Sequence, residues 1–512
     1  MLEHKILCLF VHYNANQRLD NYVLIYLKYL KKLNIDIVFI SNSLIPQQHK
    51  DTLLQEVNCS IHERENKGGD FGAWSWAINQ QLIPANTDYL LLANDSVLGP
   101  LNDLSVIIET MSAKKNIDFW GITDSLQGDW HIQSYFICFS QKVFSGVLFK
   151  EFFRQNFDSL DKKKIIRLGE IQLSQMLITN GFAGEAYIGY KNFLVAANGE
   201  KHNPTHFFWS ELIRDFNYPF LKKDLIEKNP EHFLNLLDLF EFIDTNTSYP
   251  VGLLIELFTK NRIKKDKRKD VILKPLVICH MFFYDMALLF IDQLIILLDY
   301  NASFVFNISA QLQANKPFLK ILRTIFPGCI IINSPNQGRD IGGKFAGLDM
   351  VLRLNLPSDI TLIIHDKKSL HLGNGEVWRD ELFKIIDAEY LPAVFEKFEN
   401  KKEIGIISTV NFIQDEYLVH SDTFDCTSNA QIKIIMNKYD IHTKDYKFVA
   451  GNIFWIRSEL LKKFFETRSL FEIRSELEKG NALDFGNGTF IHSWERIMSW
   501  IATSQGYKIY GV

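Results

Sequence analysis

The sequence has few cysteines and almost no net charge, and each shortage excludes a class of protein. The six cysteines in 512 residues form no C-x-x-C pair, and most lie in apolar runs, where a free thiol packs as a small hydrophobic group. This pattern favours a reducing compartment. The 56 basic and 60 acidic residues leave a formal net charge of −4, so we expect no nucleic-acid partner.

The sequence also lacks an uninterrupted apolar run of the length that crosses a membrane. Its most hydrophobic window, residues 276–298, contains His280, Asp285 and Asp292, which a membrane-spanning helix rarely carries. The apolar segment near the first residue is too short for a signal peptide. We therefore expect a cytoplasmic protein. A basic run at residues 261–270 would allow peripheral contact with anionic lipid at the inner face of the plasma membrane.

What is present is the composition of a folded α/β protein that is too large for one core. Hydrophobic residues make up 47% of the chain and charged residues 23%, and a length of 512 residues predicts two domains. Apolar segments of strand length at residues 5–11, 35–40 and 57–62 alternate with a helical pattern at residues 18–33. This alternation predicts a mostly parallel, Rossmann-type sheet with right-handed crossovers.

The stretch at residues 64–100 carries the most information about a site. It begins with a bend at Gly68 and Gly69, where the missing Cβ atoms permit a sharp turn. Asp70 stands where we expect the N-cap of a short helix. An apolar strand at residues 89–93 follows, and polar residues at the carboxyl end of such a strand lie where open α/β sheets bind ligands. The polar residues here are Asn94, Asp95 and Ser96.

The same pattern occurs a second time in the chain. NKGGDFGAWSWAI, which begins at Asn66, parallels NQGRDIGGKFAGL, which begins at Asn336. YLLLANDS, from Tyr89, parallels TLIIHDKK, from Thr361. These matches in register predict two tandem copies of one α/β fold.

The spacing of single residues supports the repeat and suggests its boundaries. His12 lies 58 positions before Asp70 (70 − 12), and His280 lies 60 positions before Asp340 (340 − 280), so we take the two histidines as counterparts. A dense basic run then marks a solvated linker between the copies. The predicted domains are module 1 (residues 1–200), a helical extension (201–260), the basic linker (261–273) and module 2 (274–512).

The polar strand end and the glycine bend of module 1 are both candidate ligand sites. Asn94, Asp95 and Ser96 offer oxygen atoms of the kind that bind Mg²⁺ or Mn²⁺, and Asp95 is the expected ligand. A tight turn without any ligand favours the same residue types and is the alternative. A helix N-terminus after Gly68 and Gly69 would favour a phosphate, although an ordinary helix cap uses the same residues.

Two glutamates are candidate general bases. Glu170 is expected to open a helix at residues 170–179, and Glu495 is placed similarly after Trp494. A carboxylate beside a sugar hydroxyl can take its proton as the hydroxyl attacks an anomeric carbon. Acidic residues also favour the first turn of a helix for dipole reasons alone. The recurrence of the glutamate in both copies favours the catalytic role.

The order of these motifs resembles GT-A-fold glycosyltransferases of the inverting type. More closely, both halves are similar to the rhamnan synthesis protein F family, which builds rhamnose-containing bacterial surface polysaccharides. The resemblance covers nearly the whole chain. The matching pieces are NKGGDFGAW, LLLANDSVLGPL and NPTHFFWSELI…YPFLKKDL in the first half, and NQGRDIGGKF, IIHDKKS, AGNIFWIR and IHSWER in the second.

The resemblance implies a function and a set of site residues. It implies transfer of L-rhamnose from dTDP-rhamnose to a hydroxyl of a lipid-linked surface polysaccharide or O-antigen-type glycan, with inversion at the anomeric carbon. Glu170 and Glu495 would be the catalytic bases. The residues expected to bind the nucleotide sugar are His12, Asn66, Gly68, Gly69, Asp70, Asn94, Asp95 and Ser96 in module 1, and His280, Arg339, Asp340, His365, Asp366, Lys367, Lys368, Trp378 and Arg379 in module 2.

The two modules depart from the Asp-x-Asp motif of GT-A enzymes in different ways. In module 1 the counterpart is Asn94-Asp95-Ser96, and the resemblance implies a Mg²⁺ or Mn²⁺ ion on Asp95, with His202 as a further metal ligand. In module 2 Lys367 and Lys368 follow the aspartate, and two cations there can neutralise a diphosphate without a metal. We therefore expect module 2 to be metal-independent.

Two other functions stay open at this point. The reduced Asp-x-Asp motif also fits a carbohydrate-binding or scaffold protein of a polysaccharide assembly that has lost catalysis. A nucleotidyltransferase would carry a glycine-rich phosphate loop directly after its first strand. The corresponding segment, HYNANQRLD, has no glycine, so this function ranks last.

Overall fold

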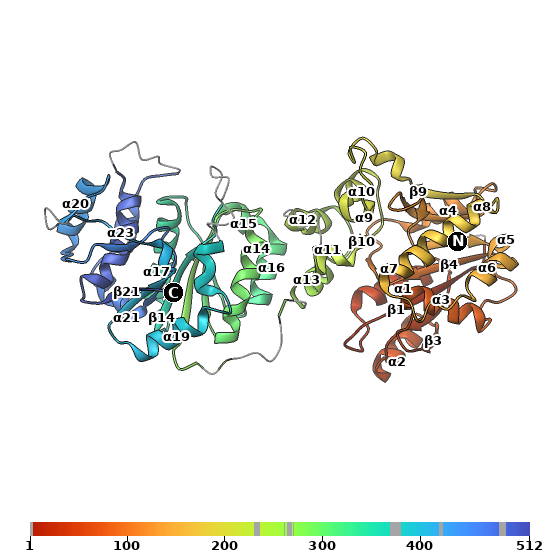
Figure 1. The fold of residues 1–512 in the computed structure, drawn as a ribbon, viewed down its shortest axis with the longest axis horizontal. Coiled ribbons are helices and arrows are strands. Elements are labelled where there is room, and N and C mark those ends of the chain that lie inside the picture. The colour runs from red at the N-terminus through yellow and green to blue at the C-terminus, as the bar shows by residue number, and fades with distance from the viewer. Residues whose placement is uncertain are drawn as a thin grey trace. The chain divides into compact units, whose positions relative to one another are not determined.

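The computed structural model describes residues 4–229, 236–260, 262–263, 269, 271–368, 380–418, 423–480 and 488–512 (Figure 1). The chain divides into two compact units, Met1–Phe233 with Phe242–Leu257 and Leu234–Glu241 with Phe258–Val512. Most of the predicted basic linker lies outside the described residues, as do Trp378 and Arg379.

The first unit contains an eight-stranded, mixed sheet with a parallel half. The strand order is β3-β2-β1-β4-β8-β6-β7, and β9 pairs with β6. The first four strands in this order are parallel, whereas β8 is antiparallel to both β4 and β6. The bounds are β1 Ile6–His12, β2 Asp36–Ser41, β3 Ser60–Glu63, β4 Tyr89–Asn94, β6 Phe119–Ser125, β7 His131–Ile132, β8 Phe136–Ser140 and β9 Gly184–Ile188.

The second unit repeats this topology for seven of the eight strands: β21 corresponds to β9, and its described sheet has no counterpart of β7. Its seven-stranded sheet has the order β13-β12-β11-β14-β20-β15-β21, again with one antiparallel strand, β20, between β14 and β15. The predicted tandem α/β fold with mostly parallel sheets is therefore confirmed. The bounds are β11 Pro275–Met281, β12 Ser303–Ile308, β13 Ile330–Asn333, β14 Ile360–His365, β15 Ile404–Ser408, β20 Phe454–Arg457 and β21 Lys508–Gly511.

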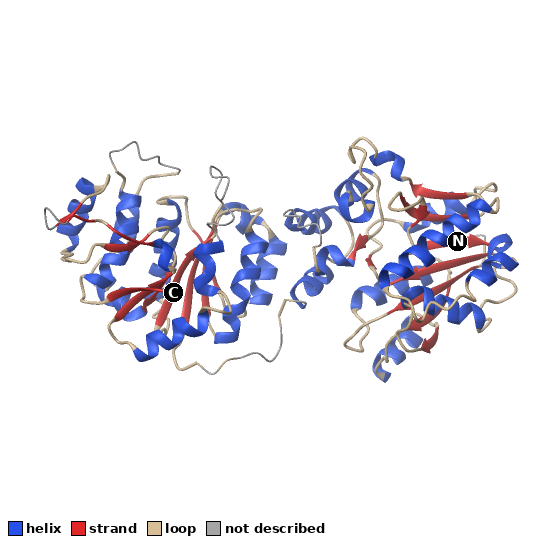
Figure 2. Ribbon diagram, viewed as in Figure 1, coloured by secondary structure: helices blue, strands red, loops and turns tan. Residues whose placement is uncertain are grey.

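The first strand of each sheet is apolar except for one histidine, because helices cover the sheet (Figure 2). Every residue of β1 and of β11 is buried. Strands buried in this way read as continuous apolar runs rather than as alternating ones. This is why the sequence shows the strands so clearly, and why their polar ends stand out as candidate sites.

Helices fill the connections between these strands. None of the helices in the described residues is both long and apolar enough to cross a lipid bilayer. Those of module 1 are α1 Asn21–Lys32, α2 Gln47–Glu56, α3 Gly69–Asn79, α4 Leu104–Ser112, α5 Gln141–Phe144, α6 Val147–Phe152, α7 Lys162–Ile165, η1 Ile166–Ile171, α8 Gln172–Thr179 and η2 Tyr190–Phe193. Those of module 2 are α14 Ala287–Leu294, η3 Ile295–Tyr300, α15 Ala310–Ala314, α16 Lys316–Ile325, α17 Arg339–Arg353, η4 Lys384–Ile386, α19 Leu391–Asn400, η5 Val410–Phe412, α20 Asn429–Tyr439, α21 Ser458–Phe465, α22 Leu470–Ser475 and α23 Phe490–Thr503.

Short elements complete both units. The extension carries α9 Pro204–Phe207, α10 Trp209–Asp215, β10 Leu221–Lys222, α11 Lys223–Glu227, α12 Leu236–Asn246 and α13 Val251–Lys260. Its strand β10 pairs antiparallel with β5, Val97–Leu98, directly after the polar end of β4. In module 2, β16 Ile413–Asp415 pairs with β19 Lys447–Val449, and β17 Tyr417–Leu418 pairs with β18 Thr423–Phe424.

Three local predictions are wrong. The N-cap of α3 is Gly68, and Asp70 lies in the first turn of the helix, because the left-handed glycine already turns the chain. Glu170 does not open a helix: it lies in the π-helical turn η1, between α7 and α8. Glu495 lies inside α23, which begins at Phe490.

The expected equivalence of His12 and His280 is wrong by one residue. The carbonyl of His12 accepts the N–H of the residue after β2, and in module 2 the carbonyl of Met281, not of His280, does the same after β12. A one-residue offset in a strand places side chains on opposite faces. Accordingly, the His12 ring packs on Phe39 at 5.5 Å between centroids, whereas His280 lies against Gly343 of α17, where no side chain would fit.

Candidate functional site

Each module has a glycine turn between its third strand and the helix that follows. Gly68 (φ 70°) and Gly338 (φ 77°) both occupy the left-handed region that L-residues with a Cβ avoid. A Cβ on either glycine would lie 3.0 Å from the Cα of a second glycine four residues later. This turn places Asp70 and Asp340 in the first turns of α3 and α17.

Asp95 and Asp366, which follow β4 and β14, fasten the loop after the first strand of their sheet. Asp366 Oδ2 accepts the N–H groups of Phe282 and Phe283 at 2.8 and 2.7 Å, and Asp95 Oδ2 accepts that of Tyr13 at 3.2 Å. The backbone N–H of each aspartate also donates to a carbonyl of the first strand. The two aspartates are therefore structural counterparts, and both carboxylates face a loop of their own chain.

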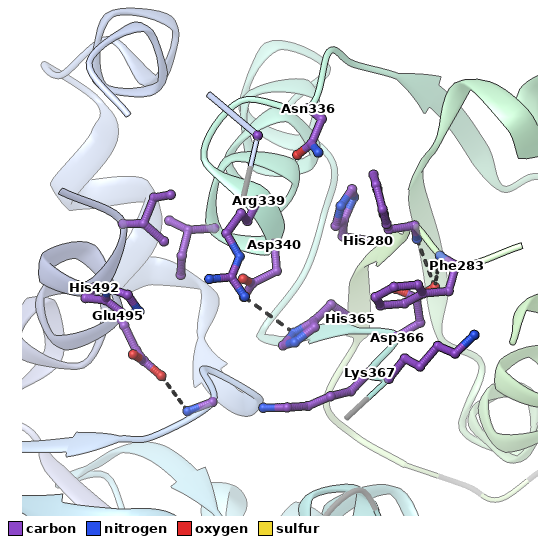
Figure 3. A pocket seen from close by; sticks show the side chains of 16 residues that line it. His280, Phe283, Asn336, Arg339, Asp340, His365, Asp366, Lys367, His492 and Glu495 are labelled. Atoms are coloured by element: carbon purple, nitrogen blue, oxygen red, sulfur yellow. Dashed lines mark hydrogen bonds and ion pairs between the residues drawn. The ribbon is translucent and has the colours of Figure 1, made fainter. Parts of the chain in front are cut away.

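Module 2 contains a cavity of about 580 Å³, which lies among the residues that follow β11 and β14 (Figure 3). This volume suits a small-molecule ligand. Predicted site residues that line it are His280, Arg339, Asp340, His365, Asp366, Lys367, Lys368 and Glu495. Lining residues that the sequence did not single out are Phe282, Phe283, Asn336, Ile341, Gly451, Gly480, Ile491 and His492.

Charges of both signs meet in this cavity. Asp340 pairs with Lys344 Nζ at 3.1 Å and lies 3.6 Å from His365 Nδ1. Burial alone would raise the pKa of Asp340, but the charges of His365 and Lys344 hold it well below its usual range. Burial raises the pKa of Asp366 to about 7, and burial lowers the pKa of Lys367 to about 8.

Glu495 reaches the cavity from α23 and is held by the loop before β20. Its Oε1 accepts the N–H of Gly451 at 2.6 Å. The ammonium group of Lys367 lies against this loop, 3.6 Å from where a Cβ on Gly451 would stand (Figure 3). In module 1, Glu170 Oε1 accepts the N–H of Ser134 at 2.6 Å, from the loop before β8. Each module therefore holds a glutamate against the loop before its antiparallel strand.

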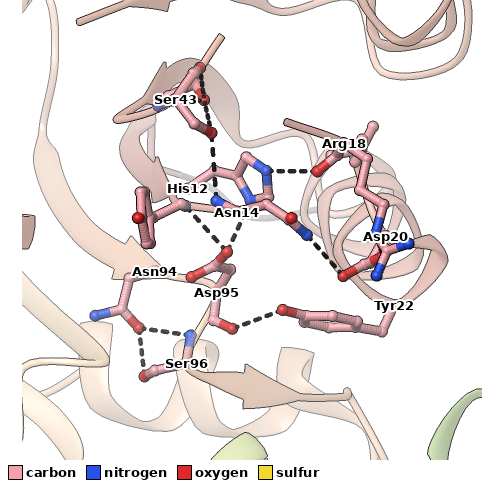
Figure 4. Close-up of polar contacts among 12 residues, drawn as sticks. His12, Asn14, Arg18, Asp20, Tyr22, Ser43, Asn94, Asp95 and Ser96 are labelled. Atoms are coloured by element: carbon pink, nitrogen blue, oxygen red, sulfur yellow. Dashed lines mark hydrogen bonds and ion pairs between the residues drawn. The ribbon is translucent and has the colours of Figure 1, made fainter. Parts of the chain in front are cut away.

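In module 1 the predicted polar residues are joined by hydrogen bonds among themselves (Figure 4). Asp95 Oδ2 lies 2.7 Å from His12 Nδ1, whose other ring nitrogen faces the carbonyl of Arg18 at 3.1 Å. Asn94 donates to Asp70 at 2.7 Å and accepts the hydroxyl of Ser96 at 2.6 Å. Burial, together with the charge of Asp95, raises the pKa of Asp70 to about 7.

Two lysines of the extension enter this part of module 1. Lys222 Nζ donates to Ser96 Oγ at 3.3 Å, and the N–H of Lys223 donates to the carbonyl of Ser96 at 3.0 Å. Burial lowers the pKa of Lys222, and the carboxylates of Glu170 and Asp70 oppose that shift. These lysines belong to the segment YPFLKKDL of the family resemblance, but nothing in the sequence assigns them a role.

Another cavity, of about 570 Å³, lies in module 1 beside the loops that follow β1, β2 and β3. Tyr13, Asn42, Arg64 and the predicted residue Asn66 are among its lining. Gly68, Gly69 and Asp70 are not. Two of its lining residues are hydrogen-bonded to each other, since Arg64 Nη1 donates to Asn42 Oδ1 at 2.8 Å.

The donor set of module 1 does not fit the expected divalent cation. No group of three or more His, Cys, Asp or Glu side chains in the described residues could hold a metal ion. His202 stacks on Phe207 at 3.8 Å between ring centroids and pairs with Glu200 at 3.2 Å. One oxygen of the Asp95 carboxylate, Oδ2, is engaged by His12 and by the N–H of Tyr13.

The strand order, the glycine turns and the paired strand-end sites define a protein of two tandem α/β modules with mostly parallel sheets. The family model described as rhamnan synthesis protein F matches residues 37–507, and the chain belongs to this family.

Relatives match parts of the chain. The virulence protein VirA of Vibrio anguillarum is 30% identical over 202 residues, which cover 34% of this chain and 64% of VirA. The uncharacterized protein WxcX of Xanthomonas campestris pv. campestris is 24% identical over 176 residues, which cover 34% of this chain and 24% of WxcX. The chain thus spans less than two thirds of either relative. Among solved structures, the glycosyltransferase GlyE of Streptococcus pneumoniae TIGR4 is 13% identical, with a TM-score of 0.29 over 76% of this chain and 91% of GlyE.

Proposed function

We propose that the chain is a glycosyltransferase of polysaccharide synthesis that moves a sugar from a nucleotide donor to a hydroxyl of a growing glycan. Membership of the rhamnan synthesis protein F family supports this class. One observation carries the proposal: Glu495, Lys367 and Arg339 line a single cavity in module 2. A base and two cations in one cavity are what glycosyl transfer from a diphosphate requires.

The cations of this cavity would bind the leaving group. Arg339 and Lys367 each place a positive side chain in the cavity lining, and a diphosphate that departs from the sugar gains negative charge. Fixed cations stabilise that charge more in the transition state than in the ground state, which is the part of binding that accelerates a reaction. The 15-residue helix α17 begins at Arg339, so its positive dipole end supports an anion at the same place.

Glu495 would act as the general base. One of its carboxylate oxygens accepts the N–H of Gly451, which fixes the side chain, and the other oxygen can take the proton of an acceptor hydroxyl. A single base with one displacement at the anomeric carbon gives inversion of configuration. Glu170 would serve the same role in module 1.

The finer assignment rests on the family description. We propose L-rhamnose carried on dTDP as the donor, because the family is named for rhamnan synthesis. The proposed acceptor is a lipid-linked surface polysaccharide or O-antigen-type glycan, which the protein would meet at the inner face of the plasma membrane.

The test is nucleotide release by the full chain from dTDP-rhamnose and from UDP-, GDP- and other dTDP-sugars. We expect binding of at least one nucleoside diphosphate, and release of it that depends on Glu495. Glu495→Gln keeps the hydrogen bond to Gly451 and removes the base, so it separates binding from chemistry. Sugar binding without any turnover would instead indicate the carbohydrate-binding or scaffold protein.

A further inference from the structure

The residue that follows Asp95 in module 1 differs from the residue that follows Asp366 in module 2. A lysine from another segment of module 1 makes up for the difference. Asp95 and Asp366 are counterparts, so Ser96 of module 1 corresponds to Lys367 of module 2. Module 1 has a serine where module 2 has this lysine. The ammonium group of Lys222, from the extension, instead reaches the Ser96 hydroxyl at 3.3 Å.

The two ammonium groups also have equivalent carboxylate neighbours. The negative charges that act most strongly on Lys367 are those of Asp340 and Glu495. Lys222 is influenced by their counterparts in module 1, Asp70 and Glu170, together with Asp224 of the following helix α11. The charges of an equivalent pair of carboxylates therefore act on two lysines from different parts of the sequence.

Backbone pairing fixes Lys222 in this place. The strand β10 pairs with β5 so that Lys222 lies opposite Val97, the residue directly after Ser96. The N–H of Lys223 donates to the Ser96 carbonyl, and the N–H of Leu101 donates to the carbonyl of Pro219 at 2.7 Å. The ammonium group of Lys222 also lies 4.6 Å from the centre of the Tyr135 ring, which favours a cation.

We propose that each module supplies its own lysine where GT-A enzymes hold a metal ion, Lys222 in module 1 and Lys367 in module 2, so that the chain binds the diphosphate of its donor without a divalent cation. The hydrogen bonds of the two strand-end aspartates favour this. Oδ2 of Asp95 contacts His12 and accepts the N–H of Tyr13. Oδ2 of Asp366 accepts the N–H groups of Phe282 and Phe283, which leaves Oδ1 of Asp366 without a hydrogen-bond partner among the described residues. A carboxylate with one oxygen engaged in this way offers at most one ligand atom to a hard cation that needs several oxygens.

This inference rests on the proposed function but can fail separately from it. The probes are inorganic pyrophosphate, which carries the diphosphate without a base, and dTDP, each titrated calorimetrically into the full chain with EDTA or with Mn²⁺. We expect binding in EDTA with an affinity within about twofold of that in Mn²⁺. Binding that appears only with Mn²⁺ would overturn the inference and leave the proposed function standing. No binding of either probe in either buffer would overturn both.

Substitutions then assign the two lysines. Lys222→Met and Lys367→Met remove one charge each while keeping most of the side-chain stem, and each should remove one of two pyrophosphate equivalents, or weaken it at least tenfold. Lys222→Arg and Lys367→Arg keep the charge and should bind in EDTA like the parent chain. Lys228→Met is the matched control, because Lys228 pairs with Asp224 on the surface at 3.2 Å.

Thermal unfolding of each variant shows whether the fold is retained. If Lys222→Met does not fold, Lys222→Arg and the EDTA titration of the parent chain still decide the question. Unchanged binding in a folded Lys222→Met variant would overturn the assignment for module 1. A Lys367→Met variant that binds as the parent does would overturn it for module 2.

Discussion

Glu170 and Glu495 make the same hydrogen bond in the two modules, each accepting a backbone N–H at 2.6 Å from the loop before the antiparallel strand. The likeness continues one turn later. The hydroxyl oxygens of Ser174 and Ser499, four residues after each glutamate, both accept a backbone N–H at 3.1 Å. A glutamate that only capped a helix would have no reason to be held in this way twice.

Replacing Glu495 tests the proposed base. Glu495→Gln should lower the rate of sugar transfer or nucleotide release by about 10²- to 10⁴-fold, the usual contribution of a general base. The affinity for dTDP should stay within about twofold, because the amide oxygen still accepts the N–H of Gly451. Glu170→Gln, measured in the same assay, shows how much of the turnover comes from module 1. A Glu495→Gln variant with parental turnover would contradict the role.

Asp366 should stabilise the fold through its loop rather than through its charge. Asp366→Ala leaves the N–H groups of Phe282 and Phe283 without their acceptor and should cost on the order of 2 kcal/mol of unfolding free energy. Asp366→Asn keeps an acceptor oxygen and should cost less than about 1 kcal/mol. Urea unfolding at pH 6 measures both.

The pKa of Asp366 adds a dependence on pH. Because the folded protein raises this pKa from 3.8 to about 7, the folded state holds the proton more tightly than the unfolded chain does. The contribution of Asp366 to stability therefore falls as the pH rises from 4 to 7. The free energy of unfolding of Asp366→Asn should lack this component. An identical pH profile for both proteins would refute the assignment.

The glycine turn of module 1 should tolerate no side chain. Gly68→Ala places a Cβ 2.8 Å from the carbonyl carbon of Phe157 in a left-handed residue, so we expect a loss of more than about 2 kcal/mol. Gly181→Ala is the matched control, since Gly181 has a φ of 82° but nothing within 4 Å of its Cβ position. That variant should lose about 1 kcal/mol. Equal losses in urea unfolding would mean that the close backbone approach is unimportant.

The sequence predicts the sheets well and the details of the sites less well. Buried strands read as apolar runs, and the repeated G-x-D-x-G turn locates both helices after the third strand, since only glycine fits it. Register is harder, because a shift of one residue between His12 and His280 leaves the apolar pattern intact. The hydrogen bonds that decide the offset join segments far apart in the chain.

Lys222 shows a second limit of the sequence. A lysine within YPFLKKDL looks like any surface lysine, and only the pairing of β10 with β5 carries it to Ser96. That pairing joins residues more than a hundred positions apart. Neither strand is long enough, or periodic enough, to be predicted from the sequence. Repetition makes Glu495 a candidate site residue, but the sequence does not show its hydrogen bond to Gly451.

Binding of the diphosphate should weaken in alkaline solution. Burial lowers the pKa of Lys367 to about 8, so above that pH the ammonium group loses its proton and its attraction for phosphate. The affinity for pyrophosphate should fall between pH 8 and 10, while the folded chain gains relative stability there because the unfolded chain still binds this proton. Lys367→Arg should keep its affinity across the same range. A flat profile for the parent chain would contradict the role of Lys367.

The most direct test of the central claim is nucleotide release from a panel of nucleotide sugars by the full chain in EDTA, compared with Glu495→Gln. We predict release with at least one donor, slower by at least a hundredfold in the variant, with dTDP bound equally well by both proteins. Failure of the parent chain to bind or turn over any nucleotide sugar, with or without Mn²⁺, would contradict the account.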